Sequence, residues 1–170
     1  MDSSIKSLEI SCNTFDHRHF TLLCESLIPN TTLTELNMMG NYMYNDDAKS
    51  IGELIKSNSS IKKLYLDDNQ IEDDGAIAIF ESLKFNSTLQ HLSLYNNIIG
   101  DDGMMCESLK SNSSLLVLEL GANSFGEDGA KSISEAIKSN STLTNLSLGD
   151  NQIKDVGTQA ICEALQCNST

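Results

Sequence analysis

Carboxylate side chains recur along the chain in short clusters that could bind a metal cation. The clusters contain Asp46, Asp47, Glu72, Asp73, Asp74, Asp101, Asp102, Glu127, Asp128 and Asp155. A calcium-binding loop needs the spacing D-x-D-x-D-G, which none of them has. Each cluster stands before a segment with helical periodicity, where acidic side chains cap free N–H groups and complement the helix dipole. We therefore expect helix capping here, and the sequence predicts neither a metal site nor a cofactor.

Histidine and cysteine offer two further kinds of chemistry. His17 and His19 beside Asp16 could ligate a metal, but they fall in a turn at the rim of the expected fold. The five cysteines are Cys12, Cys24, Cys106, Cys162 and Cys167. Their odd number and the absence of CxxC spacing indicate neither a disulfide framework nor a zinc site. Reduced thiols are typical of the cytoplasm, which is the location we expect.

Six copies of an Asn-Ser/Thr-Ser/Thr segment match the acceptor sequence for N-linked sugar. Their asparagines are Asn30, Asn58, Asn86, Asn112, Asn140 and Asn168. The N-terminal sequence MDSSIKSLEI lacks the basic flank, apolar core and cleavage site of a signal peptide. Asparagine just after a helix tolerates the left-handed conformation that ends it, and the next Ser or Thr can satisfy turn backbone groups. We therefore expect a structural role for this motif rather than glycosylation.

Composition and motifs exclude several classes of function. The chain has 24 acidic and 11 basic residues, and its net charge of -13 would repel a phosphate backbone, so we expect no nucleic-acid partner. No apolar run approaches the roughly 20 residues that span a bilayer, so we expect no membrane partner. The motifs G-x-S-x-G, H-E-x-x-H and G-x-x-x-x-G-K-S/T are absent. The sequence therefore predicts that the protein is not an enzyme.

The elements that position these side chains come from one unit repeated six times over the 170 residues. The units begin near Ile5, Leu33, Ile61, Leu89, Leu115 and Leu143. Their spacing is 28 residues, except for a 26-residue step between Leu89 and Leu115. Residues 1–170 are therefore predicted to form a single domain. The fourth unit loses two residues inside its helical segment, which should shorten that helix and leave the strand register unchanged.

Each unit opens with L-x-x-L-x-L-x-x-N, in which period-two apolar alternation predicts a short strand. The final asparagine is Asn13, Asn41, Asn69, Asn97, Asn123 or Asn151. Stacked copies would place these amides in a ladder that hydrogen-bonds the backbone of adjoining turns. Next comes a segment with apolar residues at helical spacing, such as Ala76, Ile79, Phe80 and Leu83. The unit is therefore a strand followed by an amphipathic helix.

Positions that differ between units carry two further expectations. Cys24, Cys106 and Cys162 share the inward helix position of Phe80, so we expect them in the core. Asp47 stands where later units have glycine, so the early turns should differ in shape from the later ones.

The six L-x-x-L-x-L-x-x-N segments resemble the signature of leucine-rich repeat proteins, and the 28-residue period with a helix is similar to the ribonuclease-inhibitor-like subclass. That subclass includes the C-terminal arrays of NOD-like receptors and the body of Ran GTPase-activating proteins. The resemblance implies an α/β solenoid: a right-handed horseshoe of six strand-helix repeats, with a parallel sheet on the concave face and helices on the convex face. Stacking independently predicts this curvature, because a helix is wider than a strand.

The concave face of such a sheet holds the candidate binding residues. Outward strand positions place Tyr65, His91 and Tyr95 together in the middle of the array. We predict a protein-binding site of Glu35, Asn37, Lys63, Tyr65, Asp67, His91, Ser93, Tyr95 and Glu119. Aromatic residues beside mixed charges are typical of interaction hot spots.

Three functions are consistent with this sequence. The first is a non-catalytic scaffold whose concave face binds a partner protein with a basic surface, because the repeat domain is strongly acidic. The second, implied by the resemblance alone, is a GTPase activator of the Ran GTPase-activating type, and the third is a structural spacer within a larger receptor. The chain begins with DSSI, a copy of the internal NSSI, and ends with NST before the next expected leucine. We therefore expect a piece of a longer array, or self-association through uncapped ends.

Overall fold

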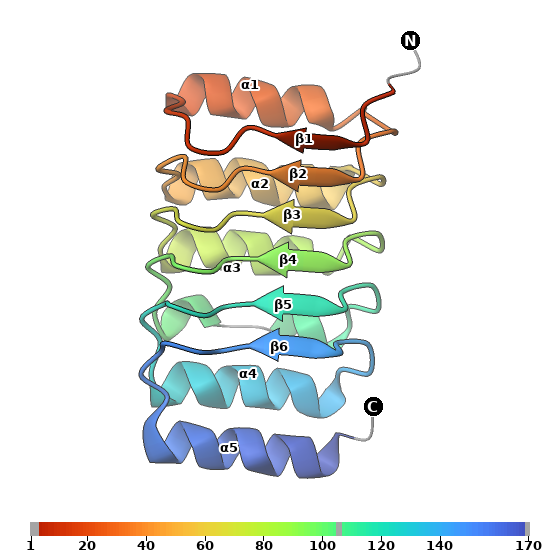
Figure 1. Ribbon diagram of the computed structural model, residues 1–170. Helices are drawn as coiled ribbons and strands as arrows, with labels where there is room; N and C mark the ends of the chain where they lie inside the picture. Colours follow the sequence, from red (N-terminus) through yellow and green to blue (C-terminus); the bar gives the residue numbers. More distant parts are fainter. Residues whose placement is uncertain (1–3, 105–106, 169–170) are drawn as a thin grey trace.

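The computed structural model describes residues 4–104 and 107–168. Six strands form one parallel sheet in chain order (Figure 1). They are β1 (Ser7–Glu9), β2 (Glu35–Asn37), β3 (Lys63–Tyr65), β4 (His91–Ser93), β5 (Val117–Glu119) and β6 (Asn145–Ser147). The connecting segments contain α1 (His17–Leu27), α2 (Asn45–Ser57), α3 (Asp73–Ser82), the 3₁₀ helices η1 (Asp102–Met104) and η2 (Glu107–Lys110), α4 (Glu127–Ser139) and α5 (Lys154–Cys167).

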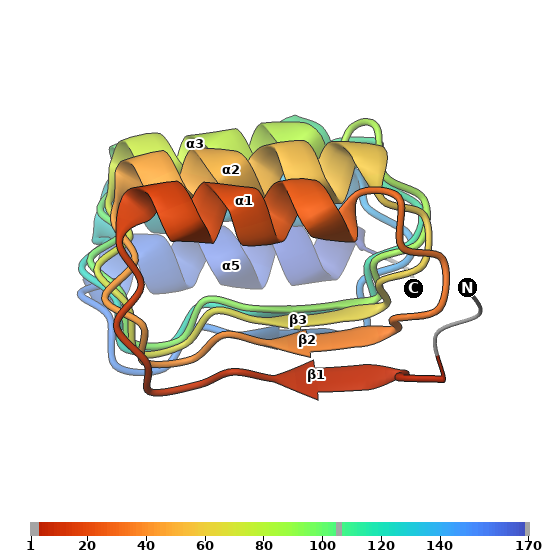
Figure 2. The same ribbon diagram turned by 90° about the horizontal axis from the view of Figure 1, so that it is seen from above.

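The helices form a second layer on one side of the sheet only. Seen from above, they lie together over the strands, and the opposite side of the sheet carries no helix (Figure 2). In Figure 1 the row of helices is longer than the row of strands, so the stack bends toward the strands. The predicted α/β solenoid, with its parallel sheet on the inner side of the curve, is therefore confirmed. None of the helices among the described residues is long and apolar enough to cross a membrane.

The core is a set of rows that run from repeat to repeat. One row consists of the middle residues of the strands, and Leu36, Leu64, Leu92 and Leu118 in it are at most 1% exposed. Leu146 in the last strand is only partly buried. A single unit therefore cannot bury its own apolar side and depends on a neighbour on each side.

The asparagine that closes each strand motif forms the predicted ladder. The side-chain nitrogen of Asn69 donates to the carbonyl oxygens of Met38 in the preceding repeat (3.3 Å) and of Leu66 in its own repeat (2.9 Å). Its side-chain oxygen accepts from the backbone N–H groups of Asn41 (2.9 Å) and Met43 (3.1 Å). One amide thus joins two consecutive turns, which satisfies backbone groups that would otherwise be buried without partners.

A second ladder comes from the asparagines after the helices. The side-chain oxygen of Asn58 accepts from the N–H groups of Ser60 and Ile61, and its side-chain nitrogen donates to the carbonyls of Leu27 and Asn30 in the preceding repeat. Asn58 is 4% exposed, so its amide is not available to an enzyme in the folded chain. These contacts support the structural explanation of the repeated sugar-acceptor sequence.

The predicted left-handed conformation at these helix exits is wrong. Asn58 has φ -86° and ψ 139°, and Asn140 and Asn168 are also extended. The extended backbone lets the asparagine side chain accept from the N–H groups two and three residues further on and close the turn. Left-handed residues occur instead just before each ladder asparagine, at Cys12, Gly40, Asp68, Asn96, Ala122 and Asp150. Only one of these residues is glycine, so the residue types do not reveal the position.

The acidic clusters stand at the helix starts as predicted, but the N-cap residues of α3, α4 and α5 make no side-chain cap, and the caps of α3 and α4 come instead from the preceding repeat. The side-chain oxygen of Asp101 accepts from the N–H groups of Gly126 (2.6 Å) and Gly129 (2.8 Å) at the start of α4. Asn45 caps Gly75 at the start of α3 in the same way (3.1 Å). A Cβ atom at Gly129 would lie 2.8 Å from this Asp101 oxygen, so the glycine makes room for the cap.

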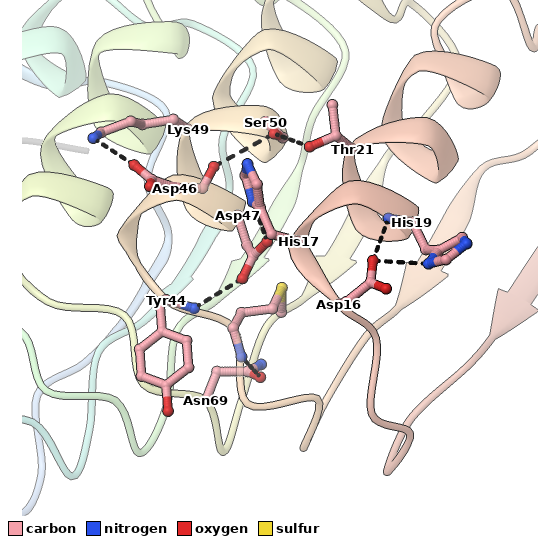
Figure 3. Close-up of polar contacts among 11 residues, drawn as sticks. Asp16, His17, His19, Thr21, Tyr44, Asp46, Asp47, Lys49, Ser50 and Asn69 are labelled. Atoms are coloured by element: carbon pink, nitrogen blue, oxygen red, sulfur yellow. Dashed lines mark hydrogen bonds and ion pairs between the residues drawn. The ribbon is translucent and has the colours of Figure 1, made fainter.

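The first two repeats use a different contact at this point, where Asp47 stands in place of the later glycines, although α1, α2 and α3 begin at equivalent positions. Nδ1 of His17 lies 2.8 Å from a carboxylate oxygen of Asp47, whose other oxygen accepts from the N–H of Tyr44 (Figure 3). His19 turns away to Asp16, at 2.7 Å. The two histidines therefore contact different acids. Among the described residues, no group of three or more histidine, cysteine and acidic side chains is arranged to hold a metal.

The fourth unit has a shortened helical segment and an unchanged strand register, as predicted. Where the other described units have an α-helix, the fourth has η1 and η2, while β4 and β5 pair His91 with Val117 in unbroken register.

The cysteines predicted to lie in the core have different outcomes. Cys24 is buried, and burial raises the pKa of its thiol to about 12. The core prediction is wrong for Cys162, which is exposed on the last described helix, and Cys106 lies outside the described residues.

Candidate functional site

The uncovered face of the sheet carries all nine residues of the predicted site. They occupy alternate positions of β2 to β5 and of the residues just after β3 and β4, because strand side chains alternate between the two faces. Glu35, Asn37, Lys63, Tyr65, Asp67, His91, Ser93, Tyr95 and Glu119 fall at these positions. The parallel register places them in columns, with Lys63 beside His91 and Tyr65 beside Ser93.

On one part of this face, opposite charges of the chain itself pair with each other. Nζ of Lys63 lies 3.6 Å from a carboxylate oxygen of Glu35 on the neighbouring strand. Asn37 accepts a hydrogen bond from the backbone N–H of Met39 and so satisfies its own turn. These side chains have partners already, and the exposed ion pair contributes about 1 kcal/mol or less to stability.

The other part is a group that we call the central cluster: Tyr65, Asp67, His91, Ser93, Tyr95 and Glu119. Its floor is Ser93, which is 1% exposed. The Ser93 hydroxyl contacts a carboxylate oxygen of Asp67, and it lies 3.2 Å from a carboxylate oxygen of Glu119. A hydroxyl has a single hydrogen to donate, so it cannot satisfy both acids at once. Two carboxylates therefore converge on one donor.

Asp67 is held in an unfavourable setting for a charge. Burial raises the pKa of Asp67 above its ordinary value, and the negative charge of Glu119 adds to the rise. Hydrogen bonds from the Ser93 hydroxyl and from the Tyr95 N–H (3.1 Å) act in the opposite direction. No lysine or arginine within the described part of the chain forms an ion pair with Asp67 or Glu119.

Aromatic rings flank these carboxylates. The rings of Tyr65 and His91 are 4.9 Å apart and tilted by 52°, and burial raises the pKa of Tyr65. Nε2 of His91 is buried and lies 3.6 Å from Glu119, which is too long for a hydrogen bond. Tyr95, which is 42% exposed, bounds the cluster in the next row of side chains along the strands.

A shallow hollow continues the site beyond Glu119. It measures about 340 Å³ and lies on the open face between β5 and β6, where Val117, Glu119, Asn145 and Ser147 contribute to its lining. Its neighbour Gly121 has no side chain, and a Cβ atom there would lie 3.1 Å from the Tyr95 ring. Small residues thus leave space beside an acid and an aromatic ring.

Comparison with known proteins identifies the repeated unit. A family model described as a leucine-rich repeat matches residues 30–52, 57–80, 85–106, 111–134 and 139–162, which together make up more than half of the chain. The chain belongs to the leucine-rich repeat family. No curated protein matches it in sequence.

Solved structures similar to this leucine-rich repeat chain have low sequence identity. One is actin-binding site 2 of leiomodin-1, with 18% identity and a TM-score of 0.61 over 98% of this chain and 82% of that one. Another is the C-terminal domain of tropomodulin from Caenorhabditis elegans, with 14% identity and a TM-score of 0.60 over 98% of this chain and 85% of that one. At these identities the similarity concerns the fold alone.

The structure brings together six of the nine predicted site residues in the central cluster, and the other three, Glu35, Asn37 and Lys63, lie beside it with partners of their own. Sequence reasoning missed the role of Ser93 as a buried floor and the hollow beside Asn145 and Ser147. The repeat alignment held a signal for the hollow, since small residues at outward strand positions leave depressions between larger neighbours, but it held none for the burial of Ser93. The assignment of a binding role to these residues stays a prediction.

Proposed function

We propose that this leucine-rich repeat chain is a non-catalytic interaction module that binds a partner protein with a basic surface through the open face of its sheet. The observation that carries the proposal is the central cluster, where two carboxylates without a lysine or arginine partner lie among the half-buried rings of Tyr65 and His91 and the exposed ring of Tyr95. Tyrosines around desolvated charge are typical of the residues that dominate binding energy.

Two further observations support this function. The net charge of -13 gives the molecule a negative field, which attracts a basic partner and speeds its association. The leiomodin-1 structure is described as an actin-binding site, so a stack of repeats like this one can serve protein binding. The cytoplasmic location stays a prediction, as does self-association through the ends of the array.

Affinity capture from an extract of the organism's own cells, followed by mass spectrometry, tests the proposal. The variant Glu35→Lys/Asp67→Lys/Glu119→Lys should lose the partner, because it reverses three charges on the open face. A matched control, Glu53→Lys/Glu81→Lys/Glu135→Lys, reverses three charges on the helices, and it should keep the partner. Equal recovery of the same partner by both variants would remove the open face from the proposal.

A further inference from the structure

The central cluster offers hydrogen-bond acceptors where the chain has few donors to match them. Asp67 and Glu119 share the Ser93 hydroxyl, and Asp67 has one further donor in the Tyr95 N–H. Nε2 of His91, 3.6 Å from Glu119, makes no hydrogen bond among the described residues. Buried or half-buried acceptors without donors are unfavourable. A ligand that supplies several donors and a positive charge would relieve this arrangement.

The shape of the cluster narrows the choice of ligand. Ser93 is a small floor, and larger side chains surround it: Tyr65 on β3 and Glu119 on β5 in the same row, and Tyr95 in the next row. A guanidinium group is flat, carries five N–H donors in fixed directions and stacks on aromatic rings. An ammonium group is compact and strongly hydrated, and it gains less from aromatic neighbours.

The hollow beyond Glu119 gives room for the rest of such a side chain. Its wall includes the apolar Val117 beside the polar Asn145 and Ser147. The three-carbon stem of an arginine can lie on apolar surface while its charged end reaches a carboxylate. A side chain that enters along this hollow meets Glu119 first and then Asp67.

We infer that the central cluster is a recognition site for an arginine side chain of the partner protein, with Asp67 and Glu119 accepting from its guanidinium group above Ser93. This inference rests on the proposed function and names the chemical group that the open face selects. It predicts preference for arginine over lysine, and rejection of a neutral group of the same shape.

Nuclear magnetic resonance titration of the ¹⁵N-labelled chain tests the site directly. The probes are three acetylated and amidated peptides, Gly-Ser-X-Ser-Gly, in which X is arginine, lysine or citrulline. The arginine peptide should saturate with a Kd on the order of millimolar, and should shift the amide signals of Ser93, Tyr95 and Glu119 most. The lysine peptide should bind several-fold more weakly, and the citrulline peptide roughly tenfold or more weakly, because citrulline has no charge.

A pair of variants provides the matched control. Asp67→Asn/Glu119→Gln keeps the size of both side chains and should weaken the arginine peptide roughly tenfold or more. Glu9→Gln/Glu35→Gln removes the same charge from the same face and should bind like the unchanged chain. Equal loss in both variants, equal binding of all three peptides, or shifts centred on the helix starts would each overturn the inference in favour of general attraction to an acidic protein.

A second pair separates this inference from the proposed function. Glu9→Trp and Asn37→Trp obstruct the open face outside both the central cluster and the hollow. If they abolish partner capture while Asp67→Asn/Glu119→Gln does not, the open face binds the partner and the arginine site is wrong. If neither pair affects capture, the proposed function itself fails.

Discussion

Single asparagine side chains hold consecutive repeats together. Asn69 joins the turns of two repeats through both ends of its amide, and it is 6% exposed. A carboxylate cannot replace it because it has no donor, and a hydroxyl cannot because it has one hydrogen where the amide nitrogen donates to several carbonyls. The asparagine in every repeat therefore has a physical explanation that does not involve a ligand.

Asn69→Ala should lower the free energy of unfolding by about 2–4 kcal/mol, because it leaves buried backbone groups without partners. The control is Asn13→Ala in the first repeat, where the side chain is exposed and its nitrogen bonds only to local carbonyls. Urea denaturation of both variants measures the difference. Equal losses would mean that the ladder contributes no more in the middle of the stack than at its edge.

Asp67 gives a prediction about pH. Because its pKa in the folded chain is raised above 3.8, the folded state binds a proton more tightly than the unfolded state between these two values. Its contribution to stability is therefore largest below the unfolded pKa and falls as the pH rises through the folded pKa. Asp67→Asn should be more stable than the unchanged chain at pH 7, and the difference should shrink toward pH 3. Denaturation midpoints across this range check it, and a constant difference would contradict it.

At the scale of elements, each helix start depends on the repeat before it. Asp101 caps α4 across a repeat boundary, and the glycine at the capped position leaves space for the acid. The first boundary has the reverse arrangement, with an acid at the glycine position and His17 as its partner. The first boundary therefore uses the same two positions as the later ones, but the acid stands at the second position instead of the first.

This exchange can be tested by a swap. Asp47→Gly alone should speed amide hydrogen exchange in α1 roughly fivefold, because His17 loses its partner; that ratio corresponds to about 1 kcal/mol. The double variant His17→Asp/Asp47→Gly recreates the later boundaries and should restore slow exchange. Exchange in α5 provides an internal control, since α5 lies at the other end of the stack. If the double variant exchanges as fast as the single one, the two positions are not coupled.

The strands and most helices could be predicted because their signals repeat. Period-two leucines and helical spacing recur in register, so Leu64 and Ile79 are assigned by comparison with their equivalents in other repeats. The conformation of the turns was harder to predict, because any residue can adopt an extended backbone and Asp68 or Ala122 can be held left-handed by their neighbours. Caps that cross a boundary, such as Asp101 on Gly129, were missed because local sequence does not show which helix start a side chain reaches.

The candidate site could be predicted only in outline. Strand alternation was enough to place Tyr65, His91 and Tyr95 on one face. The contact of Asp67 and Glu119 with one hydroxyl depends on rotamers and on the exact approach of neighbouring strands. Ser93 is a small polar residue with no distinguishing pattern, so its burial could be found only from the structure.

At the scale of the whole molecule, stability is a sum over repeats and the boundaries between them. Deletion of residues 61–88 removes one 28-residue unit and joins Ser60 to Leu89, which keeps every later side chain in register. The shorter chain should still unfold cooperatively, with a denaturant m-value lower by about a sixth. It should also lose the arginine peptide, because Tyr65 and Asp67 are removed. Deletion of residues 61–74 is the control, and should prevent folding because it shifts the register by half a unit.

The buried asparagines after the helices have a consequence for how the chain can be produced. The nitrogen that oligosaccharyltransferase would modify is the same atom that donates to the preceding repeat, as Asn58 shows. A sugar could be added only to newly made chain that has not yet stacked, and it would then keep two repeats apart. Expression through the endoplasmic reticulum should therefore yield misfolded, retained material, whereas bacterial expression, which adds no such sugar, avoids this conflict.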